Sequence, residues 1–437
     1  MEDILARARK VAEEAEVFMV SAEETPVQFE ANRLKHIQSK QSSHVALRII
    51  RKGRLGYAIS TELGDRQNLV DAAVETAEFG MKAEFELPGA TSYPQIEVFD
   101  PAVASVTFEE MVRLGSELID IVVRHTPEIL CDAEVYKGTV STRIINSRGG
   151  ELSYQQTVFS LGVQGQLIRD TDMLFVGESQ SSCHPLSDTQ AVTSVVLRQL
   201  DLAREQAPIP TRPLPVIFTP NGVASALILP LMAAFNGKVV LEGASPIDKR
   251  LGEQIFDKRL SLYDDPTLAY RPQSHPADDE GTPSQRTPLI EQGRVTSFIY
   301  DLQTAALAHQ KSTGNGGRAG GGLPNPTPSA FIIPPGEAGF SEMVSDIREG
   351  LVIEHLMGAE QGNILSGDFS GNVLLGYRIE SGKIVGRVKD TMVSGNIYRL
   401  LKDFNAIGSD AKWVGSSVYT PSLYCPRLSV ASKERHN

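Results

Sequence analysis

The spacing of hydrophobic and polar residues along the chain predicts amphipathic helices that alternate with long strand-rich stretches. Apolar residues recur at helical spacing between Met1 and Glu16. The same spacing predicts further helices over residues 65–82, 107–125 and 188–206. Thr107 and Glu110 have the spacing of a capping box at the start of the third helix. Strands are predicted over residues 26–38, 43–60 and a long region, 129–177, which turns at Asn146–Glu151.

The second half opens with a short strand and an apolar run, Gly222–Phe235, which is too short to cross a bilayer and predicts a buried helix. Strands dominate after it. A glycine-containing hairpin signal between β-forming residues occurs three times, at Lys52-Gly53, Gln292-Gly293 and Ser381-Gly382. Their uneven spacing argues against a repeat architecture.

A proline-rich segment divides the chain. Residues 208–215, "PIPTRPLP", carry four prolines in eight positions, which disfavours both a helix and a central strand. We therefore expect an N-terminal α+β domain over residues 1–207, a linker over 208–215, and a β-rich C-terminal domain with a buried apolar helix over 216–437. The predicted fold class is α+β with two domains.

The stretch "KSTGNGGRAGGGLPNPTP", Lys311–Pro328, resembles a phosphate-binding loop in composition only. A phosphate loop places its lysine and hydroxyl after the glycines, at the opening of a helix, whereas Lys311 precedes the glycines here and prolines follow them. Two interpretations stay open. The segment is a flexible surface loop, or it is a recognition loop in which Thr313, Gly314, Asn315 and Arg318 contact a ligand or partner.

The acidic run "SHPADDEGTP" offers ligands for a hard cation in His275, Asp278 and Glu280. The prolines and glycine around them favour a solvated turn before a hairpin. The less favoured alternative is that these residues line a functional site. No close pair of histidines or cysteines has the spacing of a zinc site, and no G-x-S-x-G elbow is present. We assign no catalytic and no metal-ligating residue.

Charge and cysteine content narrow the function further. The chain has 42 Lys and Arg against 54 Asp and Glu, a net charge of −12, and no dense basic cluster, which disfavours direct binding to nucleic acid. The N-terminus lacks the apolar core of a signal peptide. Three widely separated cysteines fit reduced thiols. We expect a cytoplasmic protein without membrane attachment.

Several phrases of the second half occur in a fixed order and resemble the TldD/PmbA family, also called modulators of DNA gyrase. They are "LGEQIFDKRLSLYDDPTL", "DDEGTPSQRTPLIEQGRVTSFIYD", "KSTGNGGR", "GLVIEHLMG", "GDFSG" and "VSGNIYRLLKDFNAIGSD". In the first half, "VALRIIRKGRLGYAIST" and "INSRGGELSYQQTVFSLGVQG" are similar to the family's N-terminal domain. The resemblance covers nearly the whole chain.

The resemblance also implies a subunit type. TldD-type members carry His-Glu-x-x-x-His on the first helix of the C-terminal domain and a late cysteine, which together hold zinc. The corresponding helix here reads "LILPLMAAFNG", apolar around Pro230 to Phe235, and Cys425 does not match the metal position. The chain therefore resembles the PmbA (TldE) type, which implies a TldD-like partner that carries the zinc, or a homodimer, and a peptidase complex for unfolded or leader peptides.

Two alternatives remain beside this non-catalytic subunit. One is a stand-alone hydrolase with an unrecognised metal site, for which His275, Asp278 and Glu280 are the candidates. The other is a regulatory protein that acts by binding alone. For the favoured reading, the sequence suggests that a β-rich chain with a glycine loop helps to close a groove in which an extended peptide pairs with an exposed strand.

Overall fold

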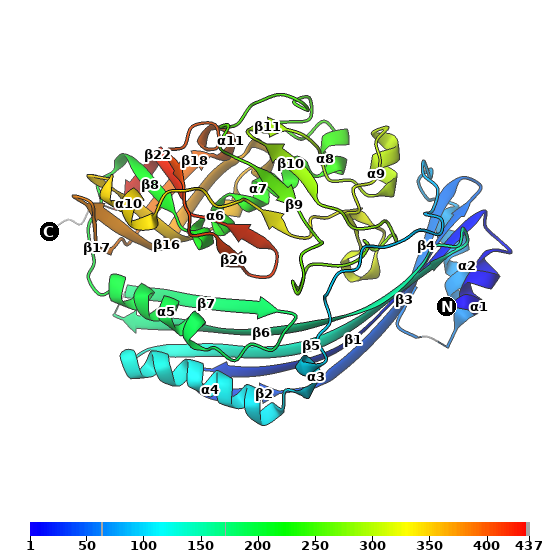
Figure 1. Ribbon diagram of the computed structural model, residues 1–437, viewed down its shortest axis with the longest axis horizontal. Helices are drawn as coiled ribbons and strands as arrows, with labels where there is room; N and C mark the ends of the chain where they lie inside the picture. Colours follow the sequence, from blue (N-terminus) through cyan, green and yellow to red (C-terminus); the bar gives the residue numbers. More distant parts are fainter. Residues whose placement is uncertain (63, 171, 434–437) are drawn as a thin grey trace.

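A computed structural model describes residues 1–62, 64–170 and 172–433. The protein has an α+β fold that consists of two strand-rich halves (Figure 1). The N-terminal half forms one long curved antiparallel sheet with the order β4-β3-β1-β5-β6-β7, and β2 pairs with the far end of β1. Its strands are β1 (Glu14–Glu30), β2 (Arg33–Ile37), β3 (Lys40–Arg51), β4 (Arg54–Ser60), β5 (Leu130–Asn146), β6 (Glu151–Arg169) and β7 (Asp172–Ser182).

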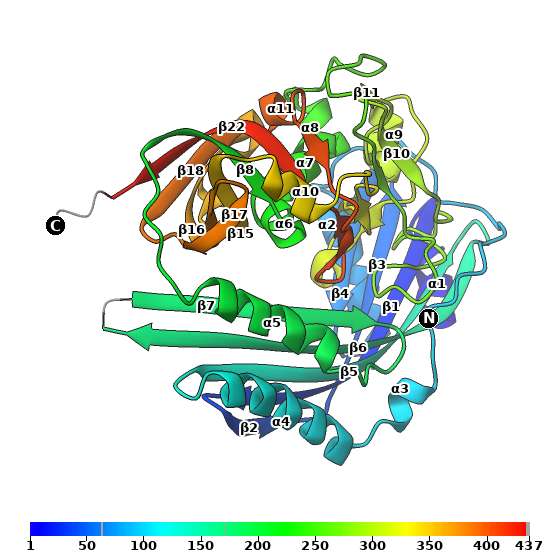
Figure 2. The same cartoon turned by 60° about the vertical axis from the view of Figure 1, so that its left-hand side comes forward.

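Helices cover one face of this sheet. Burial alternates along β5 and β6, because every second side chain points to the helix-covered face. The covering helices are α1 (Glu2–Ala8), α2 (Arg66–Ala77), α4 (Phe108–His125) and α5 (Gln190–Leu202), and a short helix, α3 (Ala102–Ser105), precedes α4. Figure 2 shows α4 and α5 lying along the strands of the sheet. The opposite face is turned toward the C-terminal half, and on it Phe18, Ala46, Ile144 and Leu152 form a small buried cluster with Ala277 of that half.

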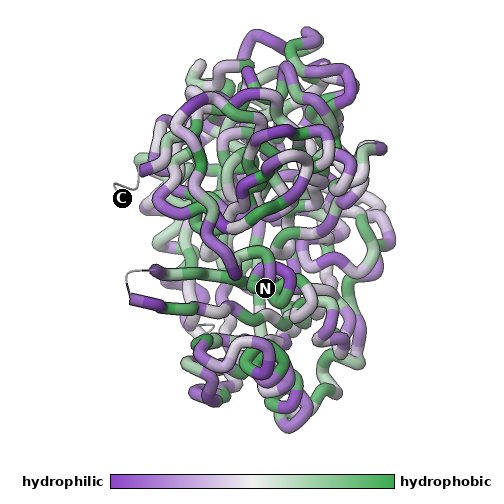
Figure 3. The backbone as a smooth tube through the Cα atoms, turned by 90° about the vertical axis from the view of Figure 1, so that its left-hand side faces the viewer, coloured by the Kyte–Doolittle hydropathy of each residue, from purple (hydrophilic) through white to green (hydrophobic). Residues whose placement is uncertain are grey.

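The C-terminal half contains a sheet that curls back on itself. Its order is β15-β8-β22-β18-β16-β17, with β19 beside β22, and β16 also pairs with β15, which closes the curl. These strands are β8 (Arg212–Phe218), β15 (Glu349–Met357), β16 (Asp368–Glu380), β17 (Lys383–Arg387), β18 (Thr391–Asn396), β19 (Ala406–Ile407) and β22 (Leu423–Ser432). Figure 3 shows hydrophobic segments running through the interior of this half and hydrophilic segments in its outer loops.

A second, smaller sheet of the C-terminal half has the order β11-β10-β9-β14-β21-β20. Its strands are β9 (Leu262–Asp264), β10 (Thr287–Glu291), β11 (Arg294–Val295), β14 (Phe331–Ile332), β20 (Lys412–Val414) and β21 (Val418–Thr420). The glycine loop adds a two-stranded ribbon, β12 (Gly316–Gly317) with β13 (Asn325–Pro326). Short helices complete the half: α6 (Pro220–Ala226), α7 (Ile228–Phe235), α8 (Gly237–Leu241), α9 (Leu302–Leu307), α10 (Phe340–Ser345) and α11 (Ile397–Leu400).

One apolar cluster joins the two halves. It runs from α4 and α5 into strands β8, β15 and β16, where Ile217, Val352 and Tyr377 are buried. The buried hydroxyl of Tyr377 also donates to the carbonyl of Gln199 in α5 at 3.5 Å. The halves therefore share core, and each buries apolar surface of the other.

The three hairpin predictions are confirmed. Each turn joins adjacent antiparallel strands, β3 to β4, β10 to β11 and β16 to β17. Both turn residues have positive φ in every case, as a two-residue type I′ turn requires: Lys52 (50°) and Gly53 (70°), Gln292 (47°) and Gly293 (76°), Ser381 (50°) and Gly382 (77°).

Helix positions were predicted better than their ends. The helix over 107–125 is confirmed as α4, where the Thr107 side chain accepts from the backbone N–H of Glu110 at 3.2 Å. The helix predicted from Met1 to Glu16 is too long, because α1 ends at Ala8 and β1 begins at Glu14. Pairing with β3 and β5 decides that segment, and such long-range pairing overrides local helical spacing. The long predicted β region divides once more than expected, into β5, β6 and β7.

The expectation that residues 208–215 contain no central strand is wrong. β8 begins at Arg212 and lies between β15 and β22. Its two prolines are tolerated because pairing with β15 covers only Val216–Phe218, beyond them, and pairing with β22 is interrupted by a bulge.

The apolar run near residue 222 is helical and buried, as predicted, but it divides into α6 and α7 at Leu227. Thr219 caps α6, and Pro220 occupies its first turn. In the described part of the chain, no helix combines the length and the apolar character needed to cross a membrane.

Candidate functional site

The acidic turn around Asp278–Glu280 and the glycine loop around Thr313–Arg318 form one buried polar cluster. The Asp278 carboxylate accepts from the backbone N–H groups of Glu280 (3.0 Å) and Thr282 (2.8 Å), and its other oxygen accepts from that of Gly316 (2.8 Å). Asp279 accepts from the backbone N–H of Arg318 at 2.8 Å. The turn therefore holds the loop in place through carboxylate-to-backbone hydrogen bonds.

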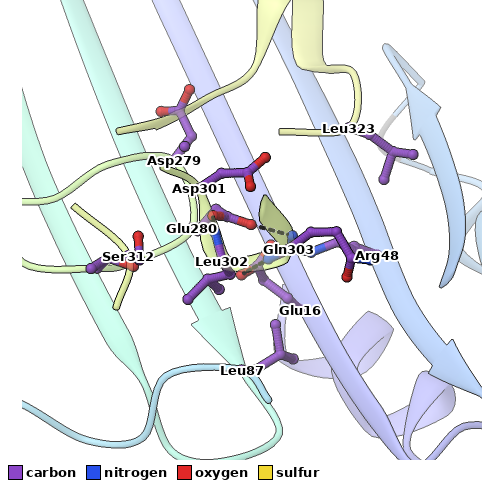
Figure 4. A network of polar contacts seen from close by, with 12 residues as sticks. Glu16, Arg48, Leu87, Asp279, Glu280, Asp301, Leu302, Gln303, Ser312 and Leu323 are labelled. Atoms are coloured by element: carbon purple, nitrogen blue, oxygen red, sulfur yellow. Dashed lines mark hydrogen bonds and ion pairs between the residues drawn. The ribbon is translucent and has the colours of Figure 1, made fainter. Parts of the chain in front are cut away.

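Four charged side chains extend this cluster into the N-terminal sheet. Glu16 on β1 and Arg48 on β3 are directly opposite each other and form an ion pair at 3.0 Å. Arg48 also donates to Glu280 at 2.5 Å, and Arg318 pairs with the second oxygen of Glu16. Figure 4 shows Glu16 and Arg48 reaching from the blue strands toward Glu280. The network thus links two strands of the sheet to two loops of the other half.

These charges are nearly inaccessible to water: Glu16 and Glu280 are 0% exposed, Arg48 2% and Arg318 8%. The remaining oxygen of Glu280 accepts from the backbone N–H of Leu302 at 2.7 Å, at the start of α9. Buried charges persist only when they are paired and hydrogen-bonded in this way. The solvated acidic turn that the sequence favoured is therefore wrong, because guanidinium and backbone N–H groups replace water there.

Asn315 and Thr313 of the glycine loop are also buried and bonded within the chain. The Asn315 side-chain amide donates to Asp264 at 2.7 Å, and the Thr313 hydroxyl donates to the Asn315 side-chain oxygen at 2.7 Å. Burial raises the pKa of Asp264 to about 7. Gly314 has a φ of 74° and a Cβ there would lie 2.9 Å from the Pro283 carbonyl, so only glycine fits without strain.

The flexible surface loop, one of the two interpretations of this stretch, does not describe its first part, where Thr313, Asn315 and Arg318 are buried. The exposed positions of the loop are Lys311, Ala319, Gly320, Asn325 and Thr327. The polar groups of Asn315 and Arg318 bind other parts of the same chain. Their proposed contact with a peptide or a partner stays a prediction.

His275 lies beside this cluster but not in it. Its ring nitrogens contact the hydroxyls of Ser284 at 2.9 Å and Ser329 at 3.1 Å. Burial lowers the pKa of His275 to about 4, so the ring is neutral near pH 7. The metal set suggested by the sequence, His275 with Asp278 and Glu280, is thus engaged in other hydrogen bonds.

A large groove lies between the halves and was not found from the sequence. Its cavity volume is 1340 Å³. One wall is the helix-free face of the N-terminal sheet, including Asp132 and Glu134 of β5 and Gln164 of β6. The other side is formed by α6, β15, β16 and the turn between β20 and β21, with Asn221, Glu354 and residues 414–416.

Five carboxylates line this groove, and no lysine or arginine is among the described lining residues: Glu30, Asp132, Glu134, Glu178 and Glu354. The Thr219 hydroxyl donates to Glu354 at 3.0 Å, and burial is the main cause that raises the pKa of Glu354. Only the alternation in "LCDAEVY", with acids at every second position of a strand, signals this face in the sequence.

The edge strand of the sheet, β7, lines this groove, but some of its backbone groups are already hydrogen-bonded to side chains. The Gln199 side chain accepts from the N–H of Gly177 at 2.9 Å and donates to its carbonyl at 3.3 Å. Arg387 donates to the carbonyl of Met173 at 3.2 Å. Side chains thus take the place of a further strand at these two positions.

The arrangement defines a two-part α+β protein with a carboxylate-lined groove between strand-rich halves that share a core. The chain belongs to the PmbA/TldD metallopeptidase family: residues 211–432 match the model for the PmbA/TldA metallopeptidase C-terminal domain, and residues 15–77 match the model for domain 1. The family resemblance seen in the sequence is confirmed.

Individual relatives align along most of the chain. Metalloprotease PmbA of Escherichia coli O157:H7 is 24% identical over 417 residues, covering 92% of this chain and 88% of the relative. A PmbA homolog of Haemophilus influenzae is 23% identical over 457 residues, covering 97% and 93%. TldE from Thermococcus kodakarensis has the same fold, with a TM-score of 0.89, 21% identity and coverage of 99% of this chain and 100% of that one.

The metalloprotease names imply a metal, and the residues of this chain that the structure describes do not fit one. In the residues that the structure describes, no three or more His, Cys, Asp or Glu side chains are grouped as ligands. Helix α7 presents Leu231 and Phe235 to the core, and Cys425 is buried in β22. We derive no step of chemistry through a metal bound to this chain.

Proposed function

We propose that this chain is the non-catalytic, PmbA/TldE-type subunit of a peptidase complex, and that a TldD-like partner supplies the zinc and the bond-breaking step. Unfolded or leader peptides are the substrates, and the complex works in the cytoplasm. The observation that carries the proposal is the apolar α7 helix: residues 230–235 offer no imidazole where a catalytic member has His-Glu-x-x-x-His.

The pattern of relatives supports the same subunit type. PmbA-type relatives align over nearly the whole chain, whereas a TldD homolog of Haemophilus influenzae, 29% identical over 164 residues, covers only 37% of it. A TldD homolog of Buchnera aphidicola, 27% identical over 239 residues, covers 54% of the chain, so the likeness to both TldD homologs is partial.

The role of this chain is to hold the substrate. Its groove, at 1340 Å³, is larger than the roughly 300–1,000 Å³ of a small-molecule pocket, which favours a polymer as the occupant. Because side chains cap β7 at Met173 and Gly177, a peptide would contact the face of the sheet more than its edge. This modifies the strand-addition idea drawn from the sequence.

The test is reconstitution. The chain is purified alone, a TldD-type protein is purified alone, and each is incubated with a disordered fluorogenic peptide before and after mixing. We expect cleavage by the mixture that chelation abolishes, a stable complex on gel filtration, and no cleavage by this chain alone.

Stoichiometric zinc in this polypeptide, together with chelator-sensitive cleavage by it alone, would refute the proposal in favour of a stand-alone hydrolase. A mixture that forms a complex but never cleaves would favour a binding-only protein. Replacing Leu229, which is 47% exposed on α7, by Ala leaves the core intact and serves as a matched control for variants placed in the groove.

A further inference from the structure

The acidic groove wall has a composition that calls for a cationic occupant. Of its five carboxylates, Glu30 pairs with Lys35 at 3.2 Å and Glu178 pairs with Lys412. Asp132, Glu134 and Glu354 make no ion pair with any residue that the structure describes. Asp132 and Glu134 therefore line the cavity without a counter-charge from the described residues, whereas Glu354 lies close enough to Lys412 and Arg198 to feel their charges.

Each of these three carboxylates is held by one neutral donor and keeps its second oxygen unengaged by described residues. Asp132 accepts from the backbone N–H of Ala31 at 2.9 Å, and Glu134 accepts from the Gln28 side chain at 2.7 Å. Glu354 accepts from Thr219. The bonds fix the position of each group without neutralising it, which leaves acceptor capacity for a ligand.

The spacing on β5 matches an extended chain. Asp132 and Glu134 are two residues apart, so they point to the same face and lie about 6–7 Å apart along the strand. Side chains on one face of an extended peptide have the same repeat. Lysine or arginine at alternate positions of such a peptide would meet both carboxylates at once when the peptide runs along β5.

Apolar surface next to the acids suits the stems of those side chains. Leu130, which is 48% exposed, precedes Asp132 on the same face of β5, and Phe175 and Leu374 also line the cavity. Lysine and arginine bury their methylene stems along such surfaces while the charged end reaches an acceptor. The net charge of −12 adds a field of the same sign, which speeds the approach of cations.

We propose that this groove selects extended peptide segments that carry lysine or arginine at alternate positions, with Asp132 and Glu134 as their principal contacts and Glu354 as a further one. This rests on the proposed function in taking the groove as the peptide site. It adds a substrate class, basic unfolded peptides, and makes this subunit the source of that preference.

The test measures binding to this chain alone by fluorescence anisotropy. Three labelled 12-residue peptides of glycine and serine are compared: one with lysine at alternate positions, one with glutamate there, and one without charge. We expect the lysine peptide to bind at least about tenfold more tightly than the uncharged one and to weaken as salt rises, as exposed ion pairs do.

The double variant Asp132→Asn with Glu134→Gln should weaken binding of the lysine peptide about tenfold, from two partly exposed ion pairs. The charge-preserving pair Asp132→Glu with Glu134→Asp should keep most of the affinity. The control is Asp71→Asn with Glu75→Gln on α2, which removes the same charge outside the groove and should leave binding unchanged.

Equal affinity for all three peptides would overturn the proposal, and so would equal loss in the control. A groove covered instead by a second copy of this chain would show no lysine-peptide binding and an oligomeric state that changes in the double variant, which also overturns it. Competition by millimolar Ca²⁺ at constant ionic strength would assign the carboxylates to a divalent cation and overturn it as well.

The peptide-binding test can fail or succeed independently of the reconstitution test of the proposed function. If the reconstituted pair cleaves peptides without regard to charge and this chain binds none selectively, the inference fails and the subunit role stands. If the pair never cleaves while the lysine peptide binds as expected, the subunit role fails and the groove assignment stands.

Discussion

Replacing Arg48 by Met removes the guanidinium that joins the N-terminal sheet to the acidic turn, and this variant is the strongest test of the buried network. Arg48 pairs with Glu16 at 3.0 Å and with Glu280 at 2.5 Å. Its side chain also lies over the Phe85 ring, 5.0 Å from the centroid, a contact that methionine can keep in part.

The expected loss of folding free energy depends on which hydrogen-bond and ion-pair partners Glu16 and Glu280 retain in the variant. Glu16 retains Arg318, and Glu280 retains only the backbone N–H of Leu302. Removing one partner of a buried ion pair costs roughly 3–5 kcal/mol, because the other charge stays buried without compensation. For cooperative unfolding of the whole 437-residue chain, with an unfolding entropy of about 2.1 cal/mol/K per residue, that corresponds to a fall in melting temperature of roughly 3–6 °C.

The assay is urea unfolding at pH 7, followed by tryptophan fluorescence and circular dichroism, with a matched control. Arg113→Met removes an exposed ion pair to Glu117 (2.8 Å, side chains 57% and 41% exposed) and should cost less than about 1 kcal/mol. Adding Glu280→Gln to Arg48→Met should recover at least about 1 kcal/mol, since it removes the uncompensated charge. Equal costs for the two arginine variants, or no recovery in the double variant, would refute the reasoning.

Three further predictions concern other buried groups. His275 is protonated near pH 6.5 in the unfolded chain and only near pH 4 in the folded protein. The free energy of unfolding should therefore fall by roughly 3 kcal/mol as the pH drops from 6.5 to 4. The variant His275→Gln should flatten the pH dependence of the urea midpoint, and the variant His309→Gln, at an exposed position, should not. Gly316→Val should destabilise by about 1–3 kcal/mol or more in thermal melts, because a Cβ there would lie 2.4 Å from Glu280 Oε2, and a wild-type melting point would contradict the packing. Burial raises the pKa of the thiols of Cys131, Cys183 and Cys425. A thiol reagent at pH 8 should therefore label none of the three in the folded protein and all three in urea. Fast labelling under native conditions would disprove their burial.

The features that could be predicted from sequence are those that depend on neighbouring residues. A polar residue followed by glycine, between two β-forming segments, favours a two-residue turn through local backbone preference, so the hairpins at Gly53, Gly293 and Gly382 were found without any knowledge of the fold. The Thr107 cap of α4 is equally local. The family could be identified because ordered phrases span the chain.

The predictions that were wrong concerned residues whose partners lie far away in the sequence. The acidic turn reads as solvated, since its counter-charge, Arg48, lies 232 residues before Glu280. Prolines in residues 208–215 read as a linker, because nothing local shows that β8 pairs with β15 only beyond them. The groove could not be seen because its walls come from strands and loops of both halves. The sequence does contain the alternating acids of β5, but only the fold shows that they face a cavity.

The apolar cluster shared by the two halves has a mechanical consequence. Because core packing continues from α4 and α5 into Val352 and Tyr377, the groove walls cannot hinge apart without exposing that core to water. Widening the groove would therefore cost the free energy of hydrating that core. If the groove binds peptides as proposed, we expect it to admit an extended chain segment more readily than a compact globular domain.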